Sequence, residues 1–136
     1  MASLNINYRT PVEVMNEAAP VIRAALPDAN VPVSVRSTGI RVEHGSVAEL
    51  GSVLDAWLAE QSDGVACVIA AEGVLDAAVP ATSRVRTLTP ELAKGLEFDL
   101  VVLVDPDAFG RGIEGAVDRY VAMTRATQRL VILGPR

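Results

Sequence analysis

The stretch 98–104, Phe-Asp-Leu-Val-Val-Leu-Val, is the most apolar strand that the sequence predicts. Strands of this kind are usually buried on both faces, which is typical of a parallel sheet. Further strands are predicted at 31–43, 65–70, 84–88 and 130–133, and helices at 10–26, 46–61, 73–79 and 116–127. Because strands alternate with helices, the sequence predicts an α/β sandwich with a mostly parallel sheet in a single domain, 1–136.

Two of the predicted helices begin with a capping box, in which a hydroxyl side chain and a glutamate three residues later bond to free amides. Thr10 and Glu13 form the first box, with Pro11 at the first helical position. Ser46 and Glu49 form the second. Between the apolar strand and the last helix, the glycine-rich stretch 107–115 is predicted as an irregular loop.

The composition is that of a compact cytoplasmic domain. Half of the 136 residues are hydrophobic, so the chain can bury a core. No apolar run approaches the about 18 residues that a membrane helix needs, the first residues lack the apolar core of a signal peptide, and no membrane partner is expected. The single cysteine, Cys67, lies in an apolar run and is predicted to be a buried, inert thiol. The net charge of −5 argues against a broad nucleic-acid surface, although it allows a few local phosphate contacts.

Several kinds of catalytic site find little support. In parallel α/β sheets, ligands usually bind at the carboxyl ends of strands, but the chain has no GxxxxGK[ST] to hold a phosphate there. Its GxGxxG string, 110–115, falls in the stretch that is predicted as an irregular loop, and alone it is weak support for a phosphate site. Asp105 ends the apolar strand as a Mg²⁺-binding aspartate would, yet an Asp-Pro turn is the favoured interpretation. His44, the only histidine, has no second histidine or cysteine to complete a metal site, and no GxSxG accompanies it. Trp57 falls on an apolar helical stripe and is predicted to be core.

Three segments carry basic side chains at structural junctions. Asn7-Tyr8-Arg9 precedes the first helix, Lys94-Gly95-Leu96-Glu97 precedes the apolar strand, and Arg125 falls within the last predicted helix. The planar fork of arginine matches phosphate oxygens, so these segments are candidates for clamping a phosphate from outside. Taken singly, each is better explained as a surface side chain whose charged head is solvated.

Taken together, these segments resemble a known family. The stretches LNINYRTP (4–11), ELAKGLEFDLVVLVDP (91–106) and DRYVAMTRATQRLVIL (118–133) look like the last three conserved motif regions of superfamily 1 helicases of the UvrD/Rep type, in the family's order. The string ELAKGLEFD also resembles the corresponding motif of the HelD-like branch, whose members act with RNA polymerase. The resemblance implies the second RecA-like domain of such a helicase, a three-layer α/β/α sandwich.

The resemblance also implies an ATP site that this chain shares with the first RecA-like domain of a longer parent protein. That domain would carry the phosphate loop and would hold most of the ATP and Mg²⁺. On the present chain, Tyr8 would lie against the adenine and Arg9 would reach the γ-phosphate. Gly95 would let the backbone approach the nucleotide, and Glu97 would accept a hydrogen bond from the ribose. Arg125 would be the arginine finger.

One motif departs from the family. The family usually has Thr-x-His before the Lys-Gly pair, where these side chains help contact the nucleic-acid strand, whereas this chain has Thr89-Pro90-Glu91. Proline removes an amide donor and glutamate repels a phosphate. The candidate nucleic-acid contacts are therefore Thr89 and Lys94 alone, and the departure favours the HelD-like branch.

Three functions follow as alternatives. The first is an ATP-dependent DNA helicase or translocase domain that acts on single-stranded DNA and is active only within its parent. The second is a HelD-like ATPase that acts on RNA polymerase. The third is a non-catalytic interaction module, which would not need to keep Arg9, Glu97 and Arg125 together. A stand-alone hydrolase is not favoured, because the chain lacks a nucleophile–base pair. The isolated chain is expected to have no ATPase activity, because it lacks the phosphate loop.

Overall fold

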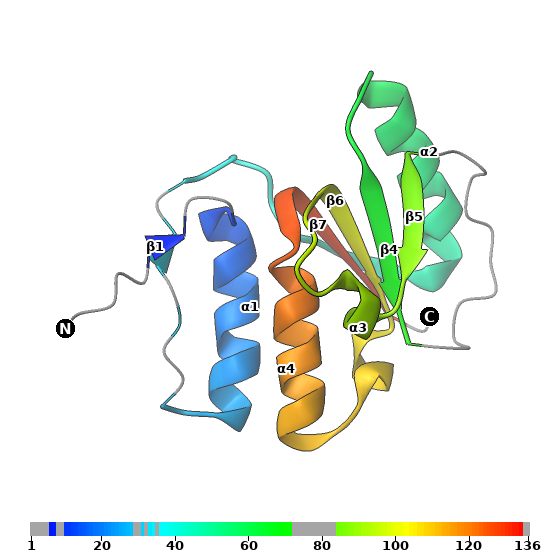
Figure 1. Cartoon of the computed structure of the whole chain (residues 1–136). Coiled ribbons are helices and arrows are strands. Elements are labelled where there is room, and N and C mark those ends of the chain that lie inside the picture. Colours follow the sequence, from blue (N-terminus) through cyan, green and yellow to red (C-terminus); the bar gives the residue numbers. More distant parts are fainter. Residues whose placement is uncertain are drawn as a thin grey trace.

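The computed structural model describes residues 6–7, 10–28, 31, 33–34, 36–71 and 84–134. Its centre is a five-stranded sheet in the order β3 (Glu43–Ser46), β7 (Ala126–Gly134), β6 (Phe98–Val104), β4 (Ala66–Ala70) and β5 (Val85–Leu88), seen from one side in Figure 1. All four strand pairings in this sheet are parallel. A separate parallel pair joins β1 (Ile6–Asn7) to β2 (Val33–Ser34). The predicted α/β fold with a mostly parallel sheet is confirmed.

Helices cover both faces of the sheet and make three layers. On one face lie α1 (Val12–Ala25), α3 (Pro90–Ala93) and α4 (Gly112–Met123), which share a buried cluster with β4, β6 and β7. On the other face lies α2 (Leu50–Glu60), which follows the 3₁₀ turn η1 (Val47–Glu49). Trp57 of α2 belongs to a second buried cluster on this face. The 3₁₀ turn η2 (Pro106–Phe109) connects β6 to α4.

The central strand β6 explains the layering. Its successive side chains alternate between the two buried clusters, with Val101 and Leu103 in the first and Leu100, Val102 and Val104 in the second. An unbroken apolar run is therefore what a strand with helices on both sides requires. Trp57 is 4% exposed, so its predicted place in the core is confirmed.

The two predicted capping boxes have opposite outcomes. The second is confirmed, because Ser46 Oγ accepts from the Ala48 amide at 3.2 Å and Glu49 accepts from the Ser46 amide at 2.8 Å. The first is wrong, because Pro11 is the cap residue of α1 and no side chain caps the helix. The Thr10 and Glu13 side chains have distant partners instead, which compete with local capping.

Glu13 binds the connection between β2 and β3. Its carboxylate accepts hydrogen bonds from the Ser37 hydroxyl and from the amides of Thr38 and Gly39. The bond from Ser37 contributes most to lowering the pKa of Glu13 from 4.5 to about 2. The carboxylate therefore fixes this connection against the first turn of α1 while it is ionised.

Several predicted boundaries move. In the described part of the predicted strand 31–43, the strands are the two-residue β2 and the first residue of β3. The predicted loop 107–115 holds most of η2 and the first turn of α4. The last helix ends at Met123 instead of 127, because Ala126 already pairs with Phe98 as the first residue of β7. The predicted helix 73–79 lies outside the described residues. In the described part of the chain, no helix is long and apolar enough to cross a membrane.

Candidate functional site

The charged segment 94–97 and Arg125 meet at one edge of the sheet. The first lies directly before β6 and the second directly before β7, and these strands are parallel neighbours. The Phe98 amide donates to the Arg125 carbonyl at 2.9 Å, which fixes the two segments side by side. This edge is formed by the amino ends of the strands. The candidate site therefore lies at the opposite ends of these strands from the carboxyl ends, where ligands of parallel sheets usually bind.

Arg125 lies in the turn between α4 and β7, not within a helix as predicted. Its guanidinium donates from Nε to the Val121 carbonyl at 3.0 Å, from Nη1 to the Leu96 carbonyl at 3.3 Å and from Nη2 to the Thr124 hydroxyl at 3.4 Å. Each of these acceptors is neutral. Among the described residues no carboxylate forms an ion pair with Arg125, so these residues orient the cation without neutralising it.

Gly95 has the backbone conformation that favours glycine. Its φ of 79° lies in the left-handed region, which side chains with a Cβ rarely adopt. A Cβ built at this position would meet no atom of the described chain within 4 Å. The conformation of the turn, and not crowding by the described residues, therefore accounts for a glycine in the segment 94–97. Glu97 is exposed in the same segment.

The candidate nucleic-acid contacts have structural partners. The Thr89 hydroxyl accepts from the Leu92 amide at 3.3 Å and so caps α3, whose first residue is Pro90. Lys94 forms an exposed ion pair with Glu91, with 3.2 Å between Nζ and Oε1. The glutamate that replaces the family's histidine thus lies against the lysine that would attract a phosphate.

The first motif is described only in part. Tyr8 and Arg9 lie outside the described residues, so their predicted roles are not tested. Thr10, which follows them, is buried, and its hydroxyl donates to the Thr124 carbonyl at 3.3 Å. The Ser34 hydroxyl donates to the Thr10 carbonyl at 2.6 Å. The residue after Arg9 therefore lies beside the residue before Arg125.

Sequence reasoning missed Thr10, Thr124 and Tyr120 as neighbours of the site. Thr10 was interpreted as a helix cap, although its place in the string NYRTP could have indicated a second role. Tyr120 is partly buried, and burial is the main cause that raises its pKa, while the charges of Arg125 and Arg23 lower it. This coupling places Tyr120 within electrostatic reach of Arg125.

The other residues considered have ordinary structural roles. His44 lies on the surface, 3.0 Å from a Glu17 oxygen. Burial raises the pKa of the Cys67 thiol to about 12, as an inert thiol requires. Asp105 adopts a left-handed φ of 48° and its carbonyl accepts from the Ala108 amide, so it forms a turn after β6. Among the described residues, no three His, Cys, Asp or Glu side chains are grouped to hold a metal ion.

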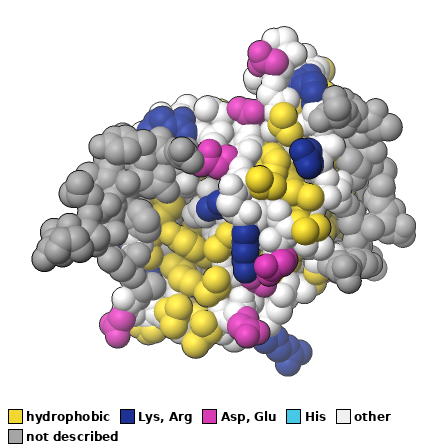
Figure 2. Space-filling model, viewed as in Figure 1, with side chains coloured by type: hydrophobic (Ala, Val, Ile, Leu, Met, Phe, Trp, Pro, Cys, Tyr) yellow, Lys and Arg dark blue, Asp and Glu magenta, His cyan; other side chains and the backbone are white. Residues whose placement is uncertain are grey.

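The surface around these elements has mixed charge. Among the described residues, Figure 2 shows hydrophobic side chains gathered in patches, one of them over α1 and α4, with separate basic and acidic side chains between the patches and no continuous basic band. Near the charged segment, Leu92 and Leu96 are exposed at 62% and 42%. A ligand here would therefore meet a few oriented cations and some apolar surface, in keeping with the net charge of −5.

The two segments that meet at this site fall in a part of the chain that is similar to a known family. Residues 84–133, which include the segment 94–97 and Arg125, match the UvrD-like helicase C-terminal domain. The predicted resemblance to UvrD-type helicases is confirmed over those residues.

A solved structure extends the likeness in fold. It is the C-terminal domain of a possible DNA helicase from Lactobacillus plantarum WCFS1, which is 16% identical to this chain. The match has a TM-score of 0.59 and covers 94% of this chain and 87% of that one. At this identity the likeness shows the fold alone. No curated protein matches the chain.

Proposed function

We propose that this chain is the second motor domain of an ATP-dependent DNA helicase or translocase. ATP would bind between it and a first RecA-like domain of the same parent protein, which supplies the phosphate loop. The observation that carries the proposal is the meeting of the segment 94–97 and Arg125 at the amino ends of β6 and β7, where the described residues leave the arginine charge without a carboxylate partner.

In this proposal Arg125 is the arginine finger that stabilises negative charge on the transferred phosphoryl group. Such fingers contribute about 10³–10⁵ to the rate in GTPases. Arg9 contacts the γ-phosphate and Tyr8 lies against the adenine. Glu97 accepts from the ribose, and Gly95 provides the turn that brings the backbone close to the nucleotide. The Thr10–Thr124 hydrogen bond supports the proposal, because it holds the residue after Arg9 beside the residue before Arg125.

The described residues fit the phosphates of ATP better than its metal ion. The guanidinium of Arg125 and the ammonium of Lys94 are donors that suit anionic oxygens. A Mg²⁺ ion prefers carboxylate and water oxygens, and among the residues proposed to contact the nucleotide only Glu97 carries a carboxylate. The Mg²⁺ bound with ATP would therefore depend mainly on the first domain, and it would neutralise charge on the transferred group there.

A second candidate function is that of a HelD-like ATPase that acts on RNA polymerase and not on a DNA strand. The ion pair between Glu91 and Lys94 favours it, because the pair lowers the positive charge at the segment where the family contacts the strand. A non-catalytic interaction module is the least supported function. Such a module would have no need for an arginine oriented by three hydrogen bonds at this edge.

The experiment is ATP turnover by the parent protein, with and without single-stranded DNA. Strong stimulation by DNA would support the translocase, and turnover indifferent to DNA would support the HelD-like function. The variant Arg125→Ala should lower kcat far more than it weakens ATP binding, because a finger acts on the transition state. Arg111→Ala is the matched control, since Arg111 is an exposed arginine at the other end of α4. Unchanged kcat in Arg125→Ala would contradict the proposed function.

A further inference from the structure

Thr124, the residue before Arg125, is one of two buried polar residues in the described core. Buried polar groups are almost always hydrogen-bonded, and each polar group of Thr124 has a partner. Its amide donates to the Tyr120 carbonyl at 3.1 Å and its hydroxyl donates to the Val121 carbonyl at 3.0 Å. Its carbonyl accepts from the Thr10 hydroxyl.

The Thr124 hydroxyl also touches the guanidinium. Its oxygen accepts from Arg125 Nη2 at 3.4 Å, while Arg125 Nε donates to the same Val121 carbonyl that the hydroxyl uses. The hydroxyl therefore lies between the last turn of α4 and the arginine head. The contact with the Leu96 carbonyl completes the set of three acceptors.

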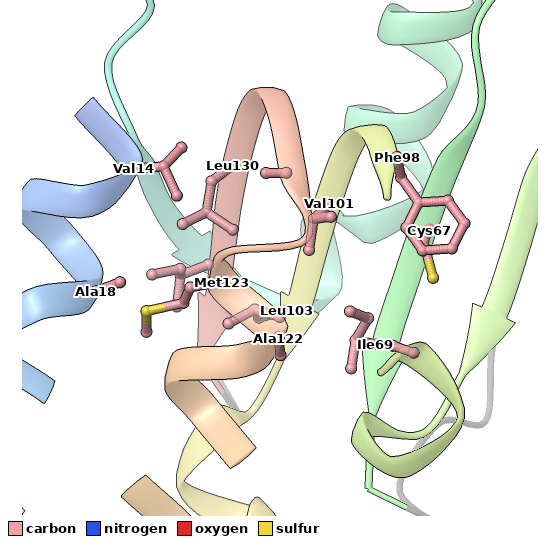
Figure 3. Packing of buried hydrophobic residues seen from close by; sticks show 13 residues of the cluster. Val14, Ala18, Cys67, Ile69, Phe98, Val101, Leu103, Ala122, Met123 and Leu130 are labelled. Atoms are coloured by element: carbon pink, nitrogen blue, oxygen red, sulfur yellow. The ribbon is translucent and has the colours of Figure 1, made fainter. Parts of the chain in front are cut away.

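The end of α4 is a fixed support for these contacts. Ala122 and Met123 are buried in the core, and Figure 3 shows them among Leu103 and Leu130 of the sheet. The interior of a protein is densely packed, so residues anchored there move little, and groups bonded to them are held in place. The position of the guanidinium is consequently fixed relative to the sheet through Thr124 and Val121, and not only through its contact with the exposed segment 94–97.

We propose that Thr124 is a positioning residue, whose hydroxyl holds the Arg125 guanidinium in the orientation from which it reaches the phosphate of the bound nucleotide. This inference rests on the proposed function. Arginine loses much rotamer freedom when it is ordered. A donor that is already oriented needs less reorganisation when charge develops in the transition state. The effect of Thr124 is therefore expected in kcat and not in ATP binding.

The test is a set of variants in the parent protein, assayed for ATP turnover. Thr124→Val removes the hydroxyl and keeps the shape, and should lower kcat about tenfold with little change in KM. Thr124→Ser keeps the hydroxyl and should restore most of the rate. Thr127→Val is the matched control, because the Thr127 hydroxyl donates to the Phe98 carbonyl at the same edge without contacting Arg125. This control should keep its kcat.

The decisive measurement combines Thr124→Val with Arg125→Ala. Because Thr124 is proposed to act through the arginine, it should have no further effect once the guanidinium is gone. A full additional loss in that background, or an unchanged kcat in Thr124→Val, would overturn the inference alone. Unchanged turnover in Arg125→Ala would overturn the proposed function with it. Should Thr124→Val fail to fold, Thr124→Ala places no methyl group at the hydroxyl position and serves the same comparison.

Discussion

The hydroxyl of Thr10 donates to the carbonyl of Thr124 at 3.3 Å, across 114 positions of sequence. Both residues are buried, so the bond is shielded from water. It joins the entry of α1 to the turn that carries Arg125. Two of the segments that resemble helicase motifs are thereby held together by the domain itself, before any nucleotide or partner domain is present.

Glu13 should make stability depend on acid pH. The pKa of Glu13 in the folded state, about 2, lies below the ordinary 4.5. Its contribution to the free energy of unfolding is therefore present above about pH 4.5 and is lost as the pH falls toward 2. We expect Glu13→Gln to be less stable than the wild type at pH 7 in urea unfolding, and this difference should vanish near pH 2. Glu114→Gln, an exposed glutamate in the first turn of α4, is the control. A difference that is constant with pH would contradict the assignment.

Gly115→Ala should destabilise the domain although alanine favours helices. A Cβ at this position would lie 2.2 Å from the Gly110 carbonyl oxygen, a backbone atom that cannot move alone. We expect a loss of about 1–3 kcal/mol in denaturant unfolding, against the about 1 kcal/mol that helix propensity alone would add. Ser52→Ala, at an exposed position of α2, changes propensity without the clash. Equal stabilisation in both variants would show that the Gly110 carbonyl does not lie against Gly115, and would contradict the predicted clash.

Substitutions of Gly95 should follow backbone preference. Its φ of 79° is tolerated by asparagine but not by β-branched residues, and there is open space around an added Cβ. In thermal unfolding of the isolated chain, Gly95→Asn should be the mildest change, Gly95→Ala should cost about 1 kcal/mol, and Gly95→Val should cost more. The reverse order would mean that this turn adopts another conformation.

Glu91→His in the parent protein should raise the stimulation of ATP turnover by single-stranded DNA. The substitution removes a carboxylate that pairs with Lys94 at 3.2 Å, and it restores the residue type that the family has there. Since the pair is exposed, we expect an increase of about two- to fivefold at low salt, smaller at high salt. Glu114→His, a change of the same charge away from this segment, should have no such effect. No increase would favour a protein, and not a DNA strand, as the partner.

Local patterns were sufficient where local interactions decide the structure. The unbroken apolar run of β6 predicted a strand buried on both faces, because such a run is satisfied only when helices cover both sides of the sheet. The capping box of Ser46 and Glu49 formed as predicted, since its partners lie within four residues. The motif strings also indicated which segments belong to one site, and the structure brings two of them, the segment 94–97 and Arg125, side by side.

The position of the candidate site and its surroundings depend on how the chain folds. The sequence was enough to predict the fold class, the buried central strand and the order of the motifs, because these follow from periodicity and from strings of neighbouring residues. It could not show that Thr10 and Glu13 prefer partners in distant segments over capping their own helix. Nor could it place Arg125 outside the helix, at the amino ends of two strands. Hydrogen bonds between segments far apart in sequence form only when the folded sheet brings them together, and no local pattern records them.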